Sequence, residues 1–163
     1  MTPVSLNRRS LLAAGESFLV AGGVTALLMA ARAQGLAPTP SMPGGANNYR
    51  KGAPLVDRIG KGGFWMSGTV RRAGDGAPLA GQRIQIWAHT VEGEEHEPQS
   101  HGATLTDKNG VFRLETPQII PVFGQPHGHL AYDSGEFQTV FLRPVMRSAK
   151  DKSLEAHFVL QPV

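Results

Sequence analysis

The chain has 163 residues, of which 40% are hydrophobic, a formal net charge of +3 and no cysteine. Its length suits one domain with an ordinary core, and the lack of cysteine excludes disulfide cross-links and a lipid-bearing cysteine behind a leader. No basic stripe is interleaved with aromatic residues, so the sequence gives no support to nucleic-acid binding.

The first 33 residues have the composition of an export signal. Arg8 and Arg9 directly precede an apolar run, which Glu16 interrupts and which ends in small residues around Arg32. A charged start, an apolar middle and a small-residue end are typical of signal peptides, and paired arginines resemble the twin-arginine type. We therefore predict a twin-arginine-type signal over residues 1–33, with its export machinery as a partner and a periplasmic or secreted mature protein. An uncleaved membrane helix is the alternative.

Residues 34–58 are rich in proline, glycine, alanine and asparagine and contain few large apolar side chains. Such a composition buries too little surface to offset the entropy lost on ordering. The sequence therefore predicts a flexible linker over residues 34–58, followed by one folded domain over residues 59–163.

Within that domain the hydrophobic residues alternate with a period of two, which indicates strands. Glycine, proline, aspartate and asparagine separate the segments, and Asp107 is expected to shape one of the turns. The expected strands are 64–72, 82–88, 103–106, 111–115, 127–132, 136–142 and 155–162. Short strands at this spacing favour an all-β fold, an antiparallel β-sandwich.

Two of the six histidines, His127 and His129, flank a single glycine in one expected strand. Residues i and i+2 of a strand point to the same face, so both imidazoles can reach one ion. Imidazole suits iron, copper, zinc and nickel. The pattern alone also fits two surface histidines that bind nothing.

Several motifs occur in a fixed order along residues 64–163. They are Gly68 and Val70 in the first strand, Gly76, Pro78 and Gly81 in a turn, Ile86–Trp87 in a strand, Thr106–Asp107 with Gly110 and Phe112 in a hairpin, and the histidine pair. In this order they resemble the intradiol ring-cleavage dioxygenases, the protocatechuate and catechol dioxygenase family. Transthyretin-like modules share the first half of the pattern but not Ile-Trp followed by His-x-His.

The resemblance implies a metal site whose ligands are altered here. That family holds ferric iron with two tyrosinates and two histidines, but both segments that would carry the tyrosines lack one. Glu95 or His96 stands where the first tyrosinate belongs, so His127, His129 and one of these two are the expected ligands. Two histidines with a carboxylate are typical of Fe(II) oxygenases, whereas three histidines would suit copper or zinc.

Four other residues near the expected metal site are considered as further ligands, as a substrate contact or as a residue outside the site. His89 and His101, which flank the same loop, are further candidate ligands. Gln125 takes the place of an arginine usual in the family and is expected to contact substrate. Tyr132 should face away from the histidine pair by strand parity.

Three other side chains are assigned no part in the chemistry. Tyr49 falls in the expected linker. Trp87 is expected to be a core residue, and His157 to be structural.

The resulting hypothesis is an exported non-haem metal-dependent oxygenase that acts on a catechol-like aromatic diol with dioxygen. Non-haem iron is the expected cofactor, with copper or zinc as alternatives. A non-catalytic transthyretin-like periplasmic binding module and a copper- or zinc-binding protein are the competing hypotheses. Self-association is left open, and no nucleic-acid partner is expected.

Overall fold

The computed structural model describes residues 35–163, so the predicted signal peptide over residues 1–33 lies outside the described part. Eight strands and one 3₁₀ helix form its regular structure: β1 (Phe64–Arg72), β2 (Arg83–Ala88), η1 (Pro98–Ser100), β3 (His101–Leu105), β4 (Val111–Thr116), β5 (Gly128–Tyr132), β6 (Val140–Leu142), β7 (Ser153–Glu155) and β8 (Phe158–Leu160). Across residues 35–163, we find no helix whose length and hydropathy would let it cross a bilayer.

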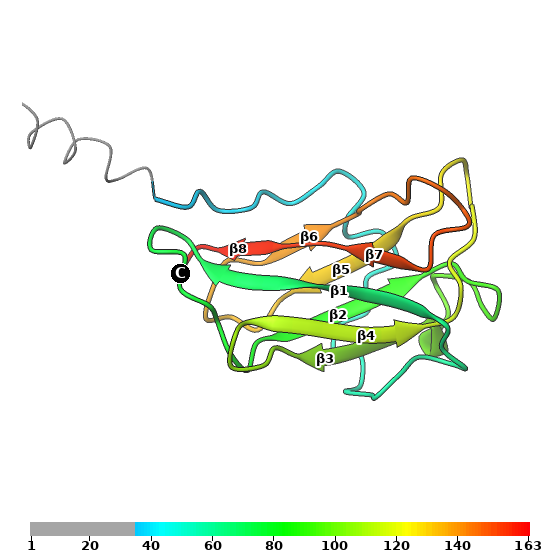
Figure 1. The fold of residues 1–163 in the computed structure, drawn as a ribbon, viewed down its shortest axis with the longest axis horizontal. Helices are drawn as coiled ribbons and strands as arrows, with labels where there is room; N and C mark the ends of the chain where they lie inside the picture. The colour runs from blue at the N-terminus through cyan, green and yellow to red at the C-terminus, as the bar shows by residue number, and fades with distance from the viewer. Residues whose placement is uncertain (1–34) are drawn as a thin grey trace, which may run out of the picture. The chain divides into compact units, whose positions relative to one another are not determined.

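The strands form two sheets with a core between them (Figure 1). One sheet has the order β4-β1-β7, with β8 also paired to β1, and the other has the order β3-β2-β5-β6. The prediction of an all-β sandwich is therefore confirmed. Alternation decides which side chains enter the core, because Ile84 and Ile86 of β2 and Leu130 of β5 point inward.

The β1 sheet differs from the antiparallel expectation at its C-terminal strands. β4 runs antiparallel to β1, but β7 and β8 both run parallel to it. The last expected strand is interrupted between β7 and β8, where the Ala156 amide donates to the Ser67 carbonyl. Gly68 permits this close approach, because a Cβ there would overlap the Ala156 carbonyl. The absence of a side chain at Gly68 thus allows β7 and β8 to pair with β1 on either side of Ala156.

Residues 35–58, which we call the N-terminal strap, lie on the domain and are hydrogen-bonded to it. The Leu36 amide donates to the Gly74 carbonyl, the Met42 amide to the Phe141 carbonyl and the Val56 amide to the Ala103 carbonyl. Residues 35–58 accordingly belong to the same compact unit as the sandwich strands. The sequence predicted a flexible linker over residues 34–58, whereas in the structure residues 35–58 are hydrogen-bonded to the domain.

The strap covers the face of the second sheet that points away from the core. Three outward-facing residues of β2 each donate a side-chain hydrogen bond to a strap carbonyl. These pairs are Arg83 to Ala53, Gln85 to Arg50 and Trp87 to Asn47. These hydrogen bonds to backbone carbonyls hold the strap in place together with the packing of Val56 on the core and of the Tyr49 ring on Trp87 and Phe141. Hydrophobic patterning has no signal for the hydrogen bonds.

Candidate metal centre

The histidine pair lies at the start of β5, on the strap side of the sheet. His127 directly precedes the strand and His129 is its second residue. Gly128 packs against Met66 and Leu130 lies in the core, so the two imidazoles point to the opposite face. Their ring centroids are 5.0 Å apart. The structure therefore brings both rings to one side of the sheet, as strand parity predicts.

Glu95 is the third member of the group. It comes from the loop between β2 and η1, and its Oε2 lies 3.3 Å from Nε2 of His129 and 3.6 Å from Nε2 of His127. The side chains are 0% exposed for His129, 4% for His127 and 16% for Glu95. All three donor atoms lie within 4.8 Å of one another. One carboxylate and two imidazoles thus converge on a buried point.

The hydrogen bonds of the two imidazoles determine which ring nitrogen is free. Nδ1 of His127 lies 2.9 Å from the Gln125 carbonyl oxygen, and Nδ1 of His129 lies 3.1 Å from the Gly45 carbonyl oxygen. A carbonyl oxygen can only accept, so both Nδ1 atoms donate, and in the neutral rings both Nε2 atoms carry a lone pair. The Arg143 guanidinium, whose Nη2 is 3.3 Å from Nδ1 of His127, can also only donate and is therefore a neighbour of that ring and not its hydrogen-bond partner. The two lone pairs are therefore available at the point where Glu95 ends.

This arrangement leaves two buried hydrogen-bond acceptors without a hydrogen-bond donor among residues 35–163. Nε2 of His129 and Oε2 of Glu95 are buried and make no hydrogen bond with any residue in the described range 35–163. Burial lowers the pKa of His129, which keeps the ring neutral at neutral pH. Two unpaired acceptors facing each other are costly, and a cation between them would satisfy both.

The spacing suits a transition metal. Bonds of about 2.0–2.2 Å from one ion to nitrogen and oxygen place neighbouring ligand atoms about 3.0–3.6 Å apart in tetrahedral or octahedral geometry. The Glu95 oxygen lies at such distances from both imidazole nitrogens. The residues present therefore fit a metal ion held by two histidines and one carboxylate, with positions left open for other ligands.

Two further contacts hold Glu95 in its loop. Nδ2 of Asn48, in the strap, donates to Oε1 of Glu95 at 2.8 Å. Nε2 of His101 lies 2.8 Å from the Glu95 backbone oxygen and donates to it, because a carbonyl oxygen can only accept. Burial lowers the pKa of His101. The loop is thereby fixed at both its side chain and its backbone.

Trp87 forms a wall of the group rather than part of the sandwich core. It is fully buried, but it lies on the strap side of the sheet, stacked between His101 and His129. The ring centroids are 5.4 Å and 5.1 Å away, and the planes are tilted by about 10° and 9°. The expectation of a core residue is thus correct for burial and wrong for the face.

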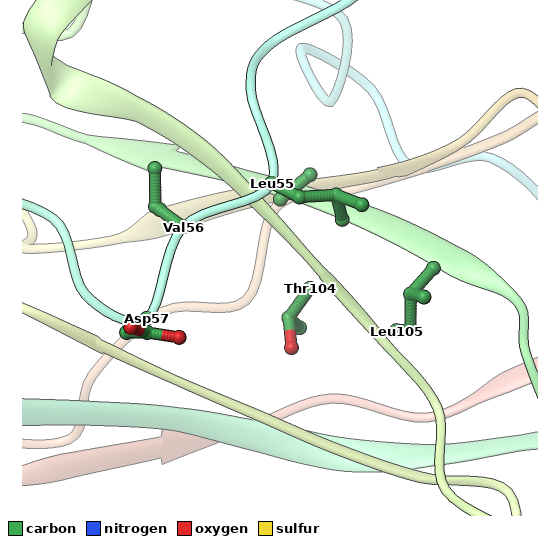
Figure 2. A pocket seen from close by; sticks show the side chains of 6 residues that line it. Leu55, Val56, Asp57, Thr104 and Leu105 are labelled. Carbon is green, nitrogen blue, oxygen red and sulfur yellow. The ribbon is translucent and has the colours of Figure 1, made fainter.

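A cavity of about 390 Å³ opens beside Glu95. It is lined by Asn48, His89, Glu94, Glu95, His96, Val122 and Phe123. This volume is in the range of small-molecule sites. A cavity of about 420 Å³ lies elsewhere, between the strap and β3, and is lined mainly by aliphatic side chains with Asp57 and Thr104 (Figure 2). That second cavity contains none of Glu95, His127 and His129 in its lining, whereas the cavity of about 390 Å³ contains Glu95.

The other predicted site residues lie around this group without joining it. His96 is 62% exposed and its Nδ1 is 3.2 Å from Glu94 Oε2, so the neighbouring Glu95 is the residue that meets the histidines. His89 lines the cavity. The Gln125 side chain is exposed and outside the cavity lining, and its backbone oxygen instead orients His127.

Neither Tyr49 nor Tyr132 belongs to the group of candidate metal ligands formed by Glu95, His127 and His129. Tyr132 is fully buried in the core, as strand parity predicts. The Tyr49 hydroxyl donates to Asp133, and burial together with that carboxylate raises the Tyr49 pKa to about 12. Both side chains therefore remain protonated phenols at neutral pH, which agrees with a site built from imidazole and carboxylate alone.

Sequence reasoning missed three contributors to the site. Asn48 and the Gly45 carbonyl come from the strap, and Arg143 places Nη2 3.3 Å from Nδ1 of His127. Nothing in the sequence marked them, because the strap has no hydrophobic period and Arg143 lies beyond a short strand. Two of the three depend on the strap lying against β2 and β5.

The fold of this chain is similar to those of several solved dioxygenase structures. Hydroxyquinol 1,2-dioxygenase from Pseudomonas putida DLL-E4 has a TM-score of 0.58 at 14% identity, over 85% of this chain and 71% of that one. For 3-chlorocatechol 1,2-dioxygenase from Rhodococcus opacus 1CP the values are 0.56 and 17%, over 85% and 77%. The dioxygenase domain of a dioxygenase–carbohydrate-binding protein fusion from Streptomyces sp. SirexAA-E gives 0.58 and 14%, over 78% and 99%.

Comparisons with protein-family models and with curated proteins give no match. The likeness in structure, at these low identities, shows that the chain has an intradiol dioxygenase-like fold.

Proposed function

We propose that the protein is a non-haem metal-dependent oxygenase that cleaves a catechol-like aromatic diol with dioxygen. The observation that carries this proposal is the buried group of Glu95, His127 and His129, in which Oε2 of Glu95 and Nε2 of His129 have no hydrogen-bond donor among residues 35–163. The intradiol dioxygenase-like fold supports the reaction class, and the donor set supports iron.

The three ligands differ in kind from two tyrosinates and two histidines. Two imidazoles and one carboxylate form the facial set that suits Fe(II). When bound, iron at this set would supply a Lewis-acidic redox centre with open positions for a diol and dioxygen. Gln125 and Gly45 fix the two imidazoles through their carbonyl oxygens, and Asn48 fixes the carboxylate. These contacts hold the ligands ready before an ion arrives.

The cavity beside Glu95 favours an uncharged aromatic substrate. Val122 and Phe123 give it an apolar wall, while Glu94 and Glu95 place two carboxylates in it, and no lysine or arginine is among its lining residues. A substrate carboxylate there would meet like charge without a cationic partner. We therefore propose a neutral diol or triol, such as catechol or hydroxyquinol, rather than an aromatic acid.

Oxygen uptake and metal analysis together test the proposal. We expect protein loaded with Fe²⁺ to consume dioxygen when catechol or hydroxyquinol is added and to release a ring-opened diacid. His129→Ala should abolish both metal retention and turnover. His157→Ala is the matched control, because that ring contacts Thr69 of β1, in the other sheet.

Other results would point to other functions. Retention of copper or zinc without oxygen uptake would identify a metal-binding protein, since the same donor set suits both ions. The proposal would be overturned if the wild-type protein retained no metal and did not consume dioxygen with any diol. A transthyretin-like binding module would then be the better description.

The twin-arginine-type motif supports export as a further part of the proposal. Arg8 and Arg9 stand before an apolar run in the manner of such signals. We propose that the mature enzyme acts in the periplasm or outside the cell. Replacement of both arginines by lysine should keep the protein in the cytoplasm, which fractionation and immunoblotting would measure.

A further inference from the structure

The carboxylate of Glu95 uses its two oxygens differently. Oε2 faces the two histidines, while Oε1 accepts a hydrogen bond of 2.8 Å from Nδ2 of Asn48. Asn48 belongs to the strap, 47 residues before Glu95 in the chain. It is the one residue in the described range whose side chain contacts the Glu95 carboxylate through a hydrogen bond. The orientation of the third candidate ligand is therefore set by a segment outside the sandwich strands.

The backbone at Asn48 is built for this contact. Its φ is +57°, in the left-handed region that asparagine tolerates better than most residues. The neighbouring carbonyls of Asn47 and Gly45 are held by Trp87 and His129. These two anchored carbonyls bring the Asn48 amide to the carboxylate, and the positive φ at this position favours an asparagine over an alanine.

We propose that Asn48 is the positioning residue of the metal site. By occupying Oε1, it restricts Glu95 to coordination through Oε2 alone and keeps a coordination position open for substrate or dioxygen. The inference rests on the proposed function, since it needs a metal at Glu95, His127 and His129. It adds that the N-terminal strap is part of the site, although the strap supplies no ligand.

The physical reason is the freedom of an unbound carboxylate. Without a donor on Oε1, the Glu95 side chain can rotate so that both oxygens face the ion, or it can turn towards the open cavity, which Glu95 also lines. The first change raises the coordination number and the second loses a ligand. Hydrogen-bond partners of metal ligands affect metal affinity by about 10–100-fold for this reason.

The test uses Co²⁺ as the probe, because its visible absorption reports both binding and coordination number. Asn48→Gly removes the amide and keeps a residue that adopts positive φ without strain. Asn48→Asp keeps the shape and the backbone tolerance but places a carboxylate against Oε1. Asn47→Ala is the matched control, because Asn47 contributes only its backbone carbonyl to Trp87.

We expect the Kd for Co²⁺ to rise by about 10–100-fold in Asn48→Gly and by at least as much in Asn48→Asp. The absorption bands of any bound Co²⁺ should weaken, as they do when coordination number increases. Asn47→Ala should keep the wild-type Kd and spectrum. The unfolding midpoint of metal-free Asn48→Gly should match that of the wild type, which separates positioning from a loss of folding.

The outcomes distinguish this inference from the proposed function. Wild-type Kd and wild-type bands in both Asn48 variants would overturn the role of Asn48 and leave the metal site standing. An equal loss in Asn47→Ala would overturn it as well, because the effect would then belong to the strap as a whole. Failure of the wild-type protein to bind Co²⁺, Fe²⁺, Cu²⁺ or Zn²⁺ would overturn both.

Discussion

Glu95 occupies an unfavourable place in the metal-free protein. Its Oε2 and the His129 Nε2 are both acceptors, both buried and 3.3 Å apart, and neither has a donor in the described part of the chain. Buried acceptors without a partner cost about 1–3 kcal/mol. Sites that bind a ligand often hold such a cost in the unbound state, because the groups are arranged for the ligand and not for each other.

Replacing this carboxylate by an amide should therefore separate stability from metal binding. In Glu95→Gln, the side-chain oxygen can still accept from Asn48, while the new NH₂ can donate to the His129 lone pair. We expect the metal-free variant to unfold at higher urea, with a gain of about 1 kcal/mol or more, and to bind metal far more weakly. Urea unfolding after chelator treatment, with metal titration in parallel, measures both.

The matched control for this prediction is Glu94→Gln. Glu94 is 62% exposed, pairs with His96 and is not one of the three converging donors. Its substitution should leave both quantities close to the wild type. A metal-free Glu95→Gln protein less stable than the wild type would show that the carboxylate has a donor, and the argument for a cation at this point would fail.

The sequence predicted only some of the candidate metal ligands without ambiguity. His127 and His129 could be assigned to one face because the period of a strand fixes the direction of each side chain. The choice between Glu95 and His96 could not be made, since a loop has no period and adjacent residues point in unrelated directions. Contacts from Asn48 and His101 decide it, and they come from distant parts of the chain.

At the scale of elements, β1 organises its sheet through contacts with three other strands. It pairs with β4, β7 and β8, and the break between the last two falls opposite Gly68. The alternating pattern predicted the strand itself, whose bounds are Phe64–Arg72. It could not predict that the last expected strand would divide, because parallel pairing and a shared partner strand leave no local trace in the sequence.

Gly68→Ala should consequently be among the most damaging small substitutions in the domain. The added methyl group would overlap the Ala156 carbonyl, and because the overlapped atoms are backbone atoms, no side-chain rotation can relieve the clash. We expect a loss of about 3 kcal/mol or more in the free energy of unfolding. Urea unfolding monitored by circular dichroism measures it.

Ser67→Ala provides the comparison in the same strand. Its side chain is half-buried, and only its backbone oxygen accepts the Ala156 amide. We expect a change within about 0.5 kcal/mol there. Similar stability of the two variants would mean that β7 and β8 can shift away from β1 at little cost.

On the scale of the whole molecule, the strap and the sandwich form one unit through the site. The strap donates to Glu95 from Asn48 and accepts from His129 at Gly45 and from Trp87 at Asn47. The composition of residues 34–58 predicted flexibility because it counts apolar surface, whereas these contacts are polar and mostly to backbone carbonyls. A Pro- and Gly-rich segment can be ordered when a neighbouring sheet presents donors along its length.

Metal binding and strap docking should therefore stabilise each other. A ligand that binds the docked arrangement more tightly than the released one shifts the equilibrium towards docking, and the coupling is reciprocal. Arg50 and Lys51 are exposed strap residues next to Gly52, so they offer trypsin a site whose cleavage requires local release. We expect bound Co²⁺ to slow cleavage at these two positions by about tenfold, a coupling of about 1.4 kcal/mol. Mass spectrometry of timed digests gives the rate at each position.

Cleavage at Lys108 supplies the internal reference, because this exposed residue lies in the turn between β3 and β4 and is not one of the three converging residues. Its rate should not respond to Co²⁺. In His129→Ala the metal should protect neither site, since the ion has lost a ligand. Equal cleavage of the strap with and without Co²⁺ in the wild-type protein would show that the ion binds without engaging residues 45–50, and the strap would then be a cover for the sheet rather than a component of the metal centre.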